Sequence, residues 1–321
     1  MPAGAPRAAA YPHAPPAPDD VRRLLLALAL LGPSASAQTP DRTPLPPGVE
    51  VVARAEWGGP APALPMVPHT PRALTVHHTG ATMNADRDPA ETLRALYAFS
   101  VSADTLGDGR AKAPWADVPY HFYIAPSGAV LEARDVAFLG DTNTRYDLSG
   151  QIQVVVEGNF DEEEPTEAQV ASLLALSSAL ARRWGFGPEA VGGHADRAPD
   201  QTVCPGDALE ARFPEVRAAV RAGALRSLDG AWSLAPRPAP DAGRFVVEVG
   251  DDGALSGTFA GSEILDGHAT ADGDALHFAL TTAADGGTAW TQGRVAGGRL
   301  EGTTYAPRRG AVSVWTATPV E

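Results

Sequence analysis

The pattern of apolar residues and glycines changes near Leu228, and this change constrains the fold more than any other feature. Residues 51–220 mix helical and strand-forming patterns, whereas residues 228–321 consist of short apolar runs separated by glycine-containing turns. Strands mixed with helices around one sheet form an α/β domain, and regularly spaced short strands form a small antiparallel barrel or sandwich. The sequence therefore predicts an α/β domain, with a mixed central sheet flanked by helices, followed by a small all-β, lipocalin-like domain.

The amino-terminal region has the composition of a processed segment. Two arginines, an apolar run over residues 24–31 and Ala35-Ser36-Ala37 follow one another in the order of a secretory signal, and the run is too short to span a bilayer. We therefore expect a secreted or periplasmic protein. Its expected segments are a mis-called start over 1–20, a signal peptide over 21–37, a Pro-rich lead-in over 38–50, the α/β domain over 51–222, a linker over 223–227 and the all-β domain over 228–321.

Local patterns predict the main elements of the first domain. Strands are expected over residues 73–77, 120–124, 129–133 and 151–156 from their β-branched and aromatic content. One helix should begin after Asp88, and another after Thr166, with Gln169 at the capping-box position. A last helix is expected over residues 207–220, with a break at Phe213-Pro214.

The charge and the cysteine content narrow the function. The net charge is −14, which argues against nucleic-acid binding, since that needs a basic surface. Cys204 is the only cysteine, so no internal disulfide can form. An unpaired cysteine in an exported protein needs another explanation, and metal ligation is the one that we favour over a buried free thiol.

Three polar segments carry the chemistry. They read Val76-His77-His78-Thr79, Pro119-Tyr120-His121-Phe122 and Gly193-His194 followed by Thr202-Val203-Cys204-Pro205. Two imidazoles and one thiolate suit a catalytic zinc, because they leave a fourth position open for water or substrate. Adjacent residues on a strand point to opposite faces, so only one of His77 and His78 can readily ligate the metal.

At this point the motifs resemble a known family in their order. Arg54-Ala55-Glu56-Trp57-Gly58 and Glu157-Gly158-Asn159-Phe160 accompany the three segments. Over residues 51–220 the chain is similar to the zinc-dependent N-acetylmuramoyl-L-alanine amidases of the peptidoglycan recognition protein superfamily, which includes the phage lysozyme-type amidases. The resemblance implies that His77, His194 and Cys204 bind Zn²⁺, that Tyr120 and Thr202 are catalytic, and that peptidoglycan or a muropeptide is the substrate.

Some features remain open within this resemblance. Glu157 is a candidate proton shuttle, and it could equally be a structural or surface carboxylate. Gly140-Asp141-Thr142 replaces the Gly-Ala-His that often lines the substrate groove of the family, and the spacing from His194 to Cys204 is longer than in familiar members. The alternative function is a non-catalytic peptidoglycan-binding protein. We favour the enzyme because non-catalytic members have usually lost the cysteine that Cys204 supplies here.

Overall fold

The computed structural model describes residues 43–320, apart from residues 107–108, 236–242, 274 and 285–286. The expected mis-called start, the signal peptide and the first part of the Pro-rich lead-in lie outside the described residues. Among the helices that are described, none is both long and apolar enough to cross a membrane.

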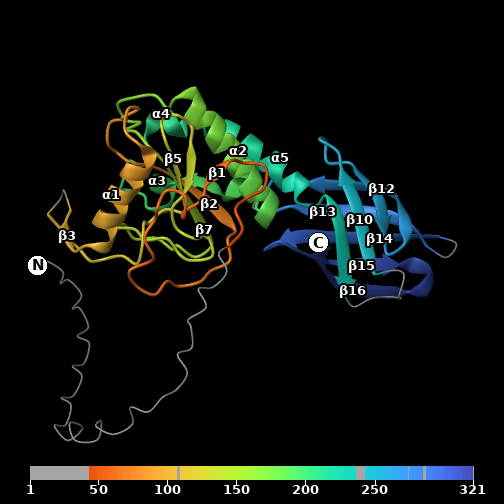
Figure 1. Cartoon of the computed structure of the whole chain (residues 1–321). Helices are drawn as coiled ribbons and strands as arrows, with labels where there is room; N and C mark the ends of the chain where they lie inside the picture. The colour runs from red at the N-terminus through yellow and green to blue at the C-terminus, as the bar shows by residue number, and fades with distance from the viewer. Residues whose placement is uncertain (1–42, 107–108, 236–242, 274, 285–286, 321) are drawn as a thin grey trace, which may run out of the picture. The chain divides into compact units, whose positions relative to one another are not determined.

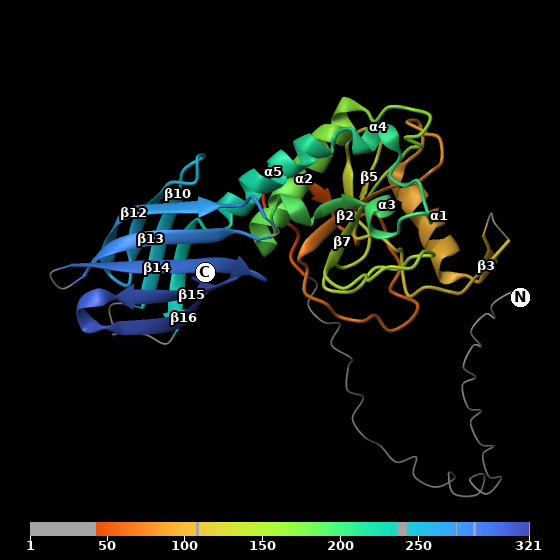
Figure 2. The ribbon, with the colours of Figure 1, turned by 180° about the vertical axis from the view of Figure 1, so that it is seen from behind.

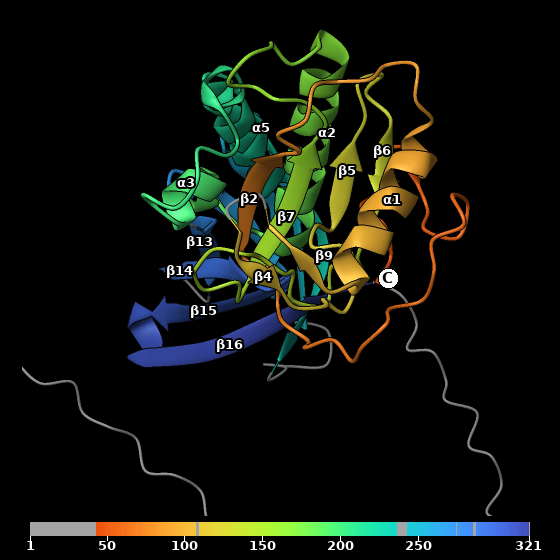
Figure 3. The same cartoon turned by 90° about the vertical axis from the view of Figure 1, so that its left-hand side faces the viewer.

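The first domain is built on one mixed sheet (Figure 3). Its strand order is β1-β6-β5-β7-β2-β8, and every neighbouring pair is parallel except β5 with β6. This arrangement confirms the predicted α/β fold. The strands are β1 (Val51–Val52), β2 (Ala73–His78), β5 (Phe122–Ile124), β6 (Val130–Glu132), β7 (Gln151–Val156) and β8 (Val191–Gly193).

Helices cover both faces of this sheet. On one face, Val76 and Val154 belong to a buried cluster with Leu173 of α2 (Glu167–Trp184) and Val220 of α5 (Phe213–Arg226). On the other face, Val155 belongs to a second cluster that contains Leu93 of α1 (Pro89–Val101). Figure 2 shows α2 and α5 side by side, with α1 apart from them. The alternation of side chains along β2 and β7 therefore assigns each residue to one of two chemically different faces.

The helix ends follow the sequence signals. The Asp88 side chain accepts a hydrogen bond from the Ala90 N–H at the start of α1. Thr166 and Gln169 form the predicted capping box of α2, and Gly185 ends that helix in the left-handed conformation. The remaining short elements are β3 (Asp104–Thr105), β4 (Ala111–Lys112), α3 (His194–Arg197), α4 (Asp207–Glu210) and the 3₁₀ turns η2 (Pro188–Ala190) and η3 (Pro307–Arg309).

Two predicted elements have different bounds in the structure. The strand expected from Tyr120 begins at Phe122, so Tyr120 lies just before β5. The helix expected over residues 207–220, with a break at Phe213-Pro214, is divided into α4 and α5 just before Phe213, and α5 continues beyond the expected end to Arg226, through most of the expected linker. Gly223 is buried against the backbone of Ser178 in α2, where a β-carbon would clash. Packing against α2 thus keeps residues 223–226 helical, which the local sequence alone does not indicate.

The carboxy-terminal region forms a closed antiparallel barrel, which confirms the predicted all-β domain and selects the barrel over the sandwich (Figure 1). Pairing of the first strand with the last closes it. Trp232 is buried, and its indole N–H donates to the Leu228 carbonyl. The strands are β9 (Gly230–Ala235), β10 (Arg244–Val249), β11 (Leu255–Phe259), β12 (Ser262–Thr270), β13 (His277–Ala284), β14 (Gly287–Ala296), β15 (Arg299–Ala306) and β16 (Ala311–Pro319).

The end of α2 contacts this barrel directly. The Leu276 N–H donates to the Gly185 carbonyl at 3.2 Å, and Phe186 pairs with Ala275 in an isolated bridge. A β-carbon on Gly185 would clash with Val295. The two folds are therefore in contact, and the proposed domain boundaries stay a prediction.

Candidate metal centre

The end of β2 places His77 on the face of the sheet that α1 shares. His77 pairs in register with Val155, a member of the α1-facing cluster. Its side chain is buried, and its ring centroid lies 5.0 Å from that of Tyr120. His78 points to the opposite face, where its Nδ1 accepts a hydrogen bond from the Phe160 N–H. Strand alternation thus separates the two neighbouring histidines, as their spacing indicates.

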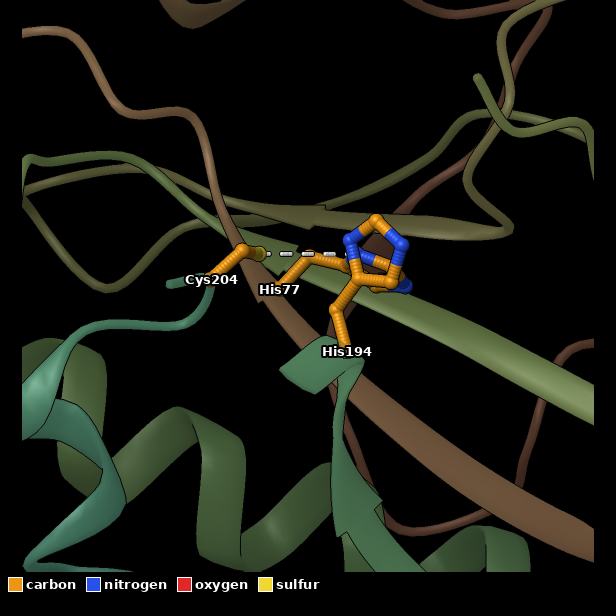
Figure 4. A group of neighbouring side chains, drawn as sticks. All are labelled: His77, His194 and Cys204. Carbon is orange, nitrogen blue, oxygen red and sulfur yellow. Dashed lines mark hydrogen bonds between the residues drawn. The ribbon is translucent and has the colours of Figure 1, made fainter. Parts of the chain in front are cut away.

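Two loops bring the other polar groups to His77. His194 is the first residue of α3, directly after β8, and Cys204 lies in the loop between α3 and α4. The potential ligand atoms of His77, His194 and Cys204 all lie within 4.8 Å of one another. Figure 4 shows the two imidazoles beside each other, with the Cys204 sulfur directed at His77. The structure therefore gathers three segments that are far apart in the sequence.

This donor set fits a zinc ion. Cys204 Sγ lies 3.7 Å from His77 Nδ1. Zinc bonds of about 2.1 Å to nitrogen and 2.3 Å to sulfur, at a tetrahedral angle, place those two atoms about 3.6 Å apart. The Nε2 atoms of both imidazoles are hydrogen-bonded elsewhere, which leaves Nδ1 of each as the atom available for a metal.

Burial sets the protonation of the three groups. It lowers the pKa of His77 well below its usual value, and it lowers the pKa of His194 to about 4. Both imidazoles are therefore neutral at physiological pH, the form that ligates metals. Burial raises the pKa of the Cys204 thiol to about 12, although a hydrogen bond from the His78 N–H opposes this rise. A nearby cation would drive off the thiol proton.

The structure places Tyr120 and Thr202 differently with respect to the metal cluster. Tyr120 is part of it through its contact with His77, and burial raises the pKa of its phenol, so the hydroxyl remains a donor at neutral pH. Thr202 Oγ1 accepts a hydrogen bond from the Cys204 N–H at 3.1 Å. Thr202 thus shapes the loop that presents the sulfur, and its catalytic role stays a prediction.

Glu157 lies directly after β7 and is buried. Its carboxylate accepts hydrogen bonds from the Tyr123 hydroxyl and from the Asn84 N–H. These contacts give the carboxylate a structural function in joining β5, β7 and the loop before α1. The proposed role of Glu157 as a proton shuttle stays a prediction.

Sequence reasoning missed a set of residues that hold the two imidazoles. Gln153 is fully buried on β7, and its Oε1 lies 2.6 Å from His77 Nε2. The Tyr146 hydroxyl also donates to this oxygen at 2.9 Å. Thr144 Oγ1 lies 2.6 Å from His194 Nε2. The available signal for Gln153 was its position as a polar residue among the apolar residues Ile152 and Val154 of β7. Nothing in the loop sequence singled out Thr144.

Other residues of the sequence motifs have structural contacts. The buried Arg54 guanidinium pairs with Asp117 at 2.8 Å, and the Trp57 indole N–H donates to the Glu132 carbonyl. His121 is fully buried and accepts a hydrogen bond from the Gln153 N–H. These residues stabilise the fold around the metal cluster and supply none of its ligand atoms.

Comparison with protein families supports the resemblance inferred from the motifs. Residues 67–207 match the family profile described as Amidase_2, N-acetylmuramoyl-L-alanine amidase. This range contains all three potential metal ligands, together with Tyr120, Glu157 and Thr202. The similarity to N-acetylmuramoyl-L-alanine amidases is thereby confirmed for this part of the chain. No curated protein matches the chain.

Several solved structures resemble part of this chain. Drosophila peptidoglycan recognition protein SD is 24% identical, with 51% of this chain and 92% of that chain covered and a TM-score of 0.42. The N-acetylmuramoyl-L-alanine amidase LysC from Clostridium intestinale is 24% identical, with 55% and 97% covered and a TM-score of 0.38. Human PGRP-Iβ C-terminal domain, solved with glycosamyl muramyl pentapeptide, is 21% identical, with 50% and 92% covered and a TM-score of 0.42. Similarities at this level carry no information on the chemistry of this chain.

Proposed function

We propose that this chain is a zinc-dependent hydrolase that cleaves the amide bond between N-acetylmuramic acid and L-alanine in peptidoglycan. The observation that carries the proposal is the convergence of His77, His194 and Cys204 ligand atoms within 4.8 Å. These residues lie in the segment that matches the amidase family. We also propose that the protein acts outside the cytoplasm, on the basis of the signal-like pattern over residues 21–37.

The ligand set determines the reaction class. His77 and His194 would bind zinc as neutral imidazoles and Cys204 as a thiolate, so the protein contributes one negative charge and leaves room for a further ligand. When bound, zinc supplies Lewis-acid polarisation of the amide carbonyl and an activated water. A carboxylate in place of the thiolate would favour harder cations, whereas sulfur favours zinc.

The chain's own residues orient the reacting groups. Gln153 Oε1 accepts the Nε2 proton of His77, which fixes the tautomer whose Nδ1 faces Cys204. Tyr120 keeps its proton, so its hydroxyl can donate to the oxygen on which negative charge develops. The metal ligands do not specify which peptide stem is preferred. The segment that often lines the substrate groove of the family differs here, with Gly140-Asp141-Thr142 in place of Gly-Ala-His. Asp141 is engaged by the buried Arg134.

Digestion of purified peptidoglycan tests this proposal. Protein incubated with zinc should release peptides with a free L-alanine amine and leave muramic acid with a free lactyl carboxylate, both identified by mass spectrometry. A chelator should stop the release, and added zinc should restore it. Cys204→Ser protein is the matched control for contaminating hydrolases. Zinc-loaded protein that binds peptidoglycan and cleaves no amide bond would instead identify a recognition protein.

A further inference from the structure

The outer surface of the barrel carries an unusual group of exposed apolar side chains. Trp290 on β14 is 51% exposed and Tyr305 on β15 is 41% exposed, while Val312 and Val314 on β16 are 67% and 71% exposed. These strands are neighbours in the barrel (Figure 1). Contiguous exposed apolar groups on a soluble protein mark a binding surface more often than isolated ones do.

Strand register joins these side chains into two adjacent rows. Trp290 pairs with Tyr305, and Tyr305 pairs with Val312. One step further along each strand face, Gln292 pairs with Thr303, and Thr303 with Val314. The ring centroids of Trp290 and Tyr305 are 5.8 Å apart, and their planes differ by 27°. The aromatic pair therefore lies directly beside a row with hydrogen-bonding side chains.

Apart from Val312, the residues of these rows line a hollow on the outer face of β12 to β16. Two depressions of about 770 and 500 Å³ share His268, Ala279, Gln292 and Thr303 in their linings, so they form one continuous hollow. Each depression alone is within the size range of small-molecule sites, so the hollow has room for a sugar-sized ligand and is far larger than an ion site. Ala279 lines the middle of the hollow and leaves space above the sheet.

The charge of the hollow excludes several classes of ligand. Its charged lining residues are Asp266, Arg294 and Glu301, and Arg294 pairs with Glu301. The lining has about one net negative charge, on a chain whose net charge is −14. Nucleic acids and anionic wall polymers need a basic surface, which is missing from this lining. The barrel is closed, so a peptide cannot add to it as an extra edge strand.

We propose that this hollow binds a neutral glycan built of N-acetylated hexosamines, and that it holds the protein on insoluble peptidoglycan. A pyranose ring has an apolar face of C–H groups that packs on aromatic rings such as Trp290 and Tyr305. Its hydroxyl and acetamido groups can hydrogen-bond to Gln292 and Thr303 at the side. The choice of glycan rests on the proposed amidase function, because the substrate of that reaction is a polymer of this kind.

Co-sedimentation with insoluble polysaccharides tests the site. The full chain carrying Cys204→Ser is mixed with peptidoglycan stripped of anionic polymers and, separately, with chitin, which has N-acetylglucosamine and no peptide stems. Both should retain the protein. Adding Trp290→Ala and Tyr305→Ala should weaken binding to chitin by about tenfold, the loss of an aromatic anchor. Val246→Ala, at an exposed valine on β10 outside the hollow, is the matched control and should bind like its parent.

Further measurements separate the possible outcomes. Circular dichroism establishes that the double variant folds, and Gln292→Ala, which leaves both rings in place, should weaken chitin binding by a smaller factor. Chitin binding that is unchanged by all of these variants overturns the glycan site. Binding to phosphatidylcholine vesicles in place of chitin, or a concentration-dependent dimer that the double variant abolishes, also overturns it. Hydrolysis of soluble muropeptides by the Trp290→Ala/Tyr305→Ala chain with intact Cys204 reports on the amidase proposal alone, since that reaction needs no retention on a solid.

Discussion

The two regions of this molecule differ in what they bury. In the described part of the α/β region, charged and polar side chains such as Arg54, Asp117, His121 and Gln153 are almost completely inaccessible to solvent. In the described part of the barrel, the buried polar side chains are two threonines, Thr282 and Thr291. Buried polar groups are costly unless they are hydrogen-bonded, so a region that contains many of them is organised around a polar site.

The difference shows where chemistry can occur in each region. Hydrogen bonds fix the polar groups at the metal cluster of the α/β region, as those from Gln153 and Thr144 do for the two imidazoles. The barrel interior instead contains packed aromatic rings, among them Phe245, Phe278 and Trp315. The glycan site that we propose for the barrel therefore lies on its outer face. Changes in the first region should alter chemistry, and changes in the second should alter stability or retention.

The largest expected effect is that of Cys204→Ser. Serine is a poor neutral ligand, so zinc content and amide hydrolysis should both fall to background, while circular dichroism and the barrel stay unchanged. Elemental analysis and a soluble muropeptide assay measure the two losses. Full hydrolysis by metal-checked Cys204→Ser protein would rule out the thiolate as a ligand.

Tyr120→Phe should reduce kcat by about 10² to 10³ and change KM little, because the lost hydroxyl would act on charge that develops in the transition state. Steady-state kinetics on a soluble muropeptide, with zinc content verified, distinguishes the two parameters. An unchanged kcat would show that Tyr120 packs against His77 and takes no part in the reaction.

Gln153→Leu should weaken zinc binding by about 10- to 100-fold, because the Nε2 proton of His77 loses its acceptor and the imidazole is no longer held in one tautomer. Competition with a chromogenic chelator measures the affinity. Gln151→Leu is the matched control, since Gln151 lies on the same strand and its Oε1 accepts from Thr75 instead. Equal affinities for the two variants would show that His77 is oriented without Gln153.

Gly302→Ala should destabilise the barrel by about 1 to 3 kcal/mol through overpacking. The new β-carbon would lie 2.5 Å from the Trp315 ring and would also meet the Gln292 carbonyl. Gly273→Ala is the control, since a β-carbon there meets nothing within 4 Å. Thermal unfolding measures both. Turnover of soluble muropeptides well below the melting temperature should be unaffected in Gly302→Ala protein, and its loss would show that the barrel supports the metal site.

The last effect appears only when the pH falls below neutral. Burial lowers the pKa of His121 from 6.5 to about 3. Since the unfolded state takes up the proton first, the contribution of neutral His121 to stability is complete above pH 6.5 and declines as the pH falls towards 3. The slope is about 1.4 kcal/mol per pH unit. His121→Asn protein should be less stable at neutral pH, and its denaturation midpoint should fall less steeply with acidification. If the denaturation midpoints of the two proteins fall equally steeply with acidification, buried neutral His121 is not the source of the pH dependence.

The sequence by itself determined the fold class of both regions, because hydrophobic periodicity and turn residues are local signals. It also predicted β7, the Thr166–Gln169 capping box and the order of the motifs that contain His77, His194 and Cys204. It could limit the choice between His77 and His78 to one residue, since the two side chains on a strand must diverge.

Tertiary structure decided what depends on contacts between distant segments. The pairing of β2 with β7 places Gln153 beside His77, and the absence of a side chain at Gly140 leaves room for the Gln153 amide. Packing of Gly223 against α2 extends α5 through the expected linker. Register across five barrel strands assembles the hollow that Trp290 and Tyr305 help to line from residues that look ordinary in sequence. Periodicity specifies which way a side chain points, whereas only the folded chain specifies what it meets there.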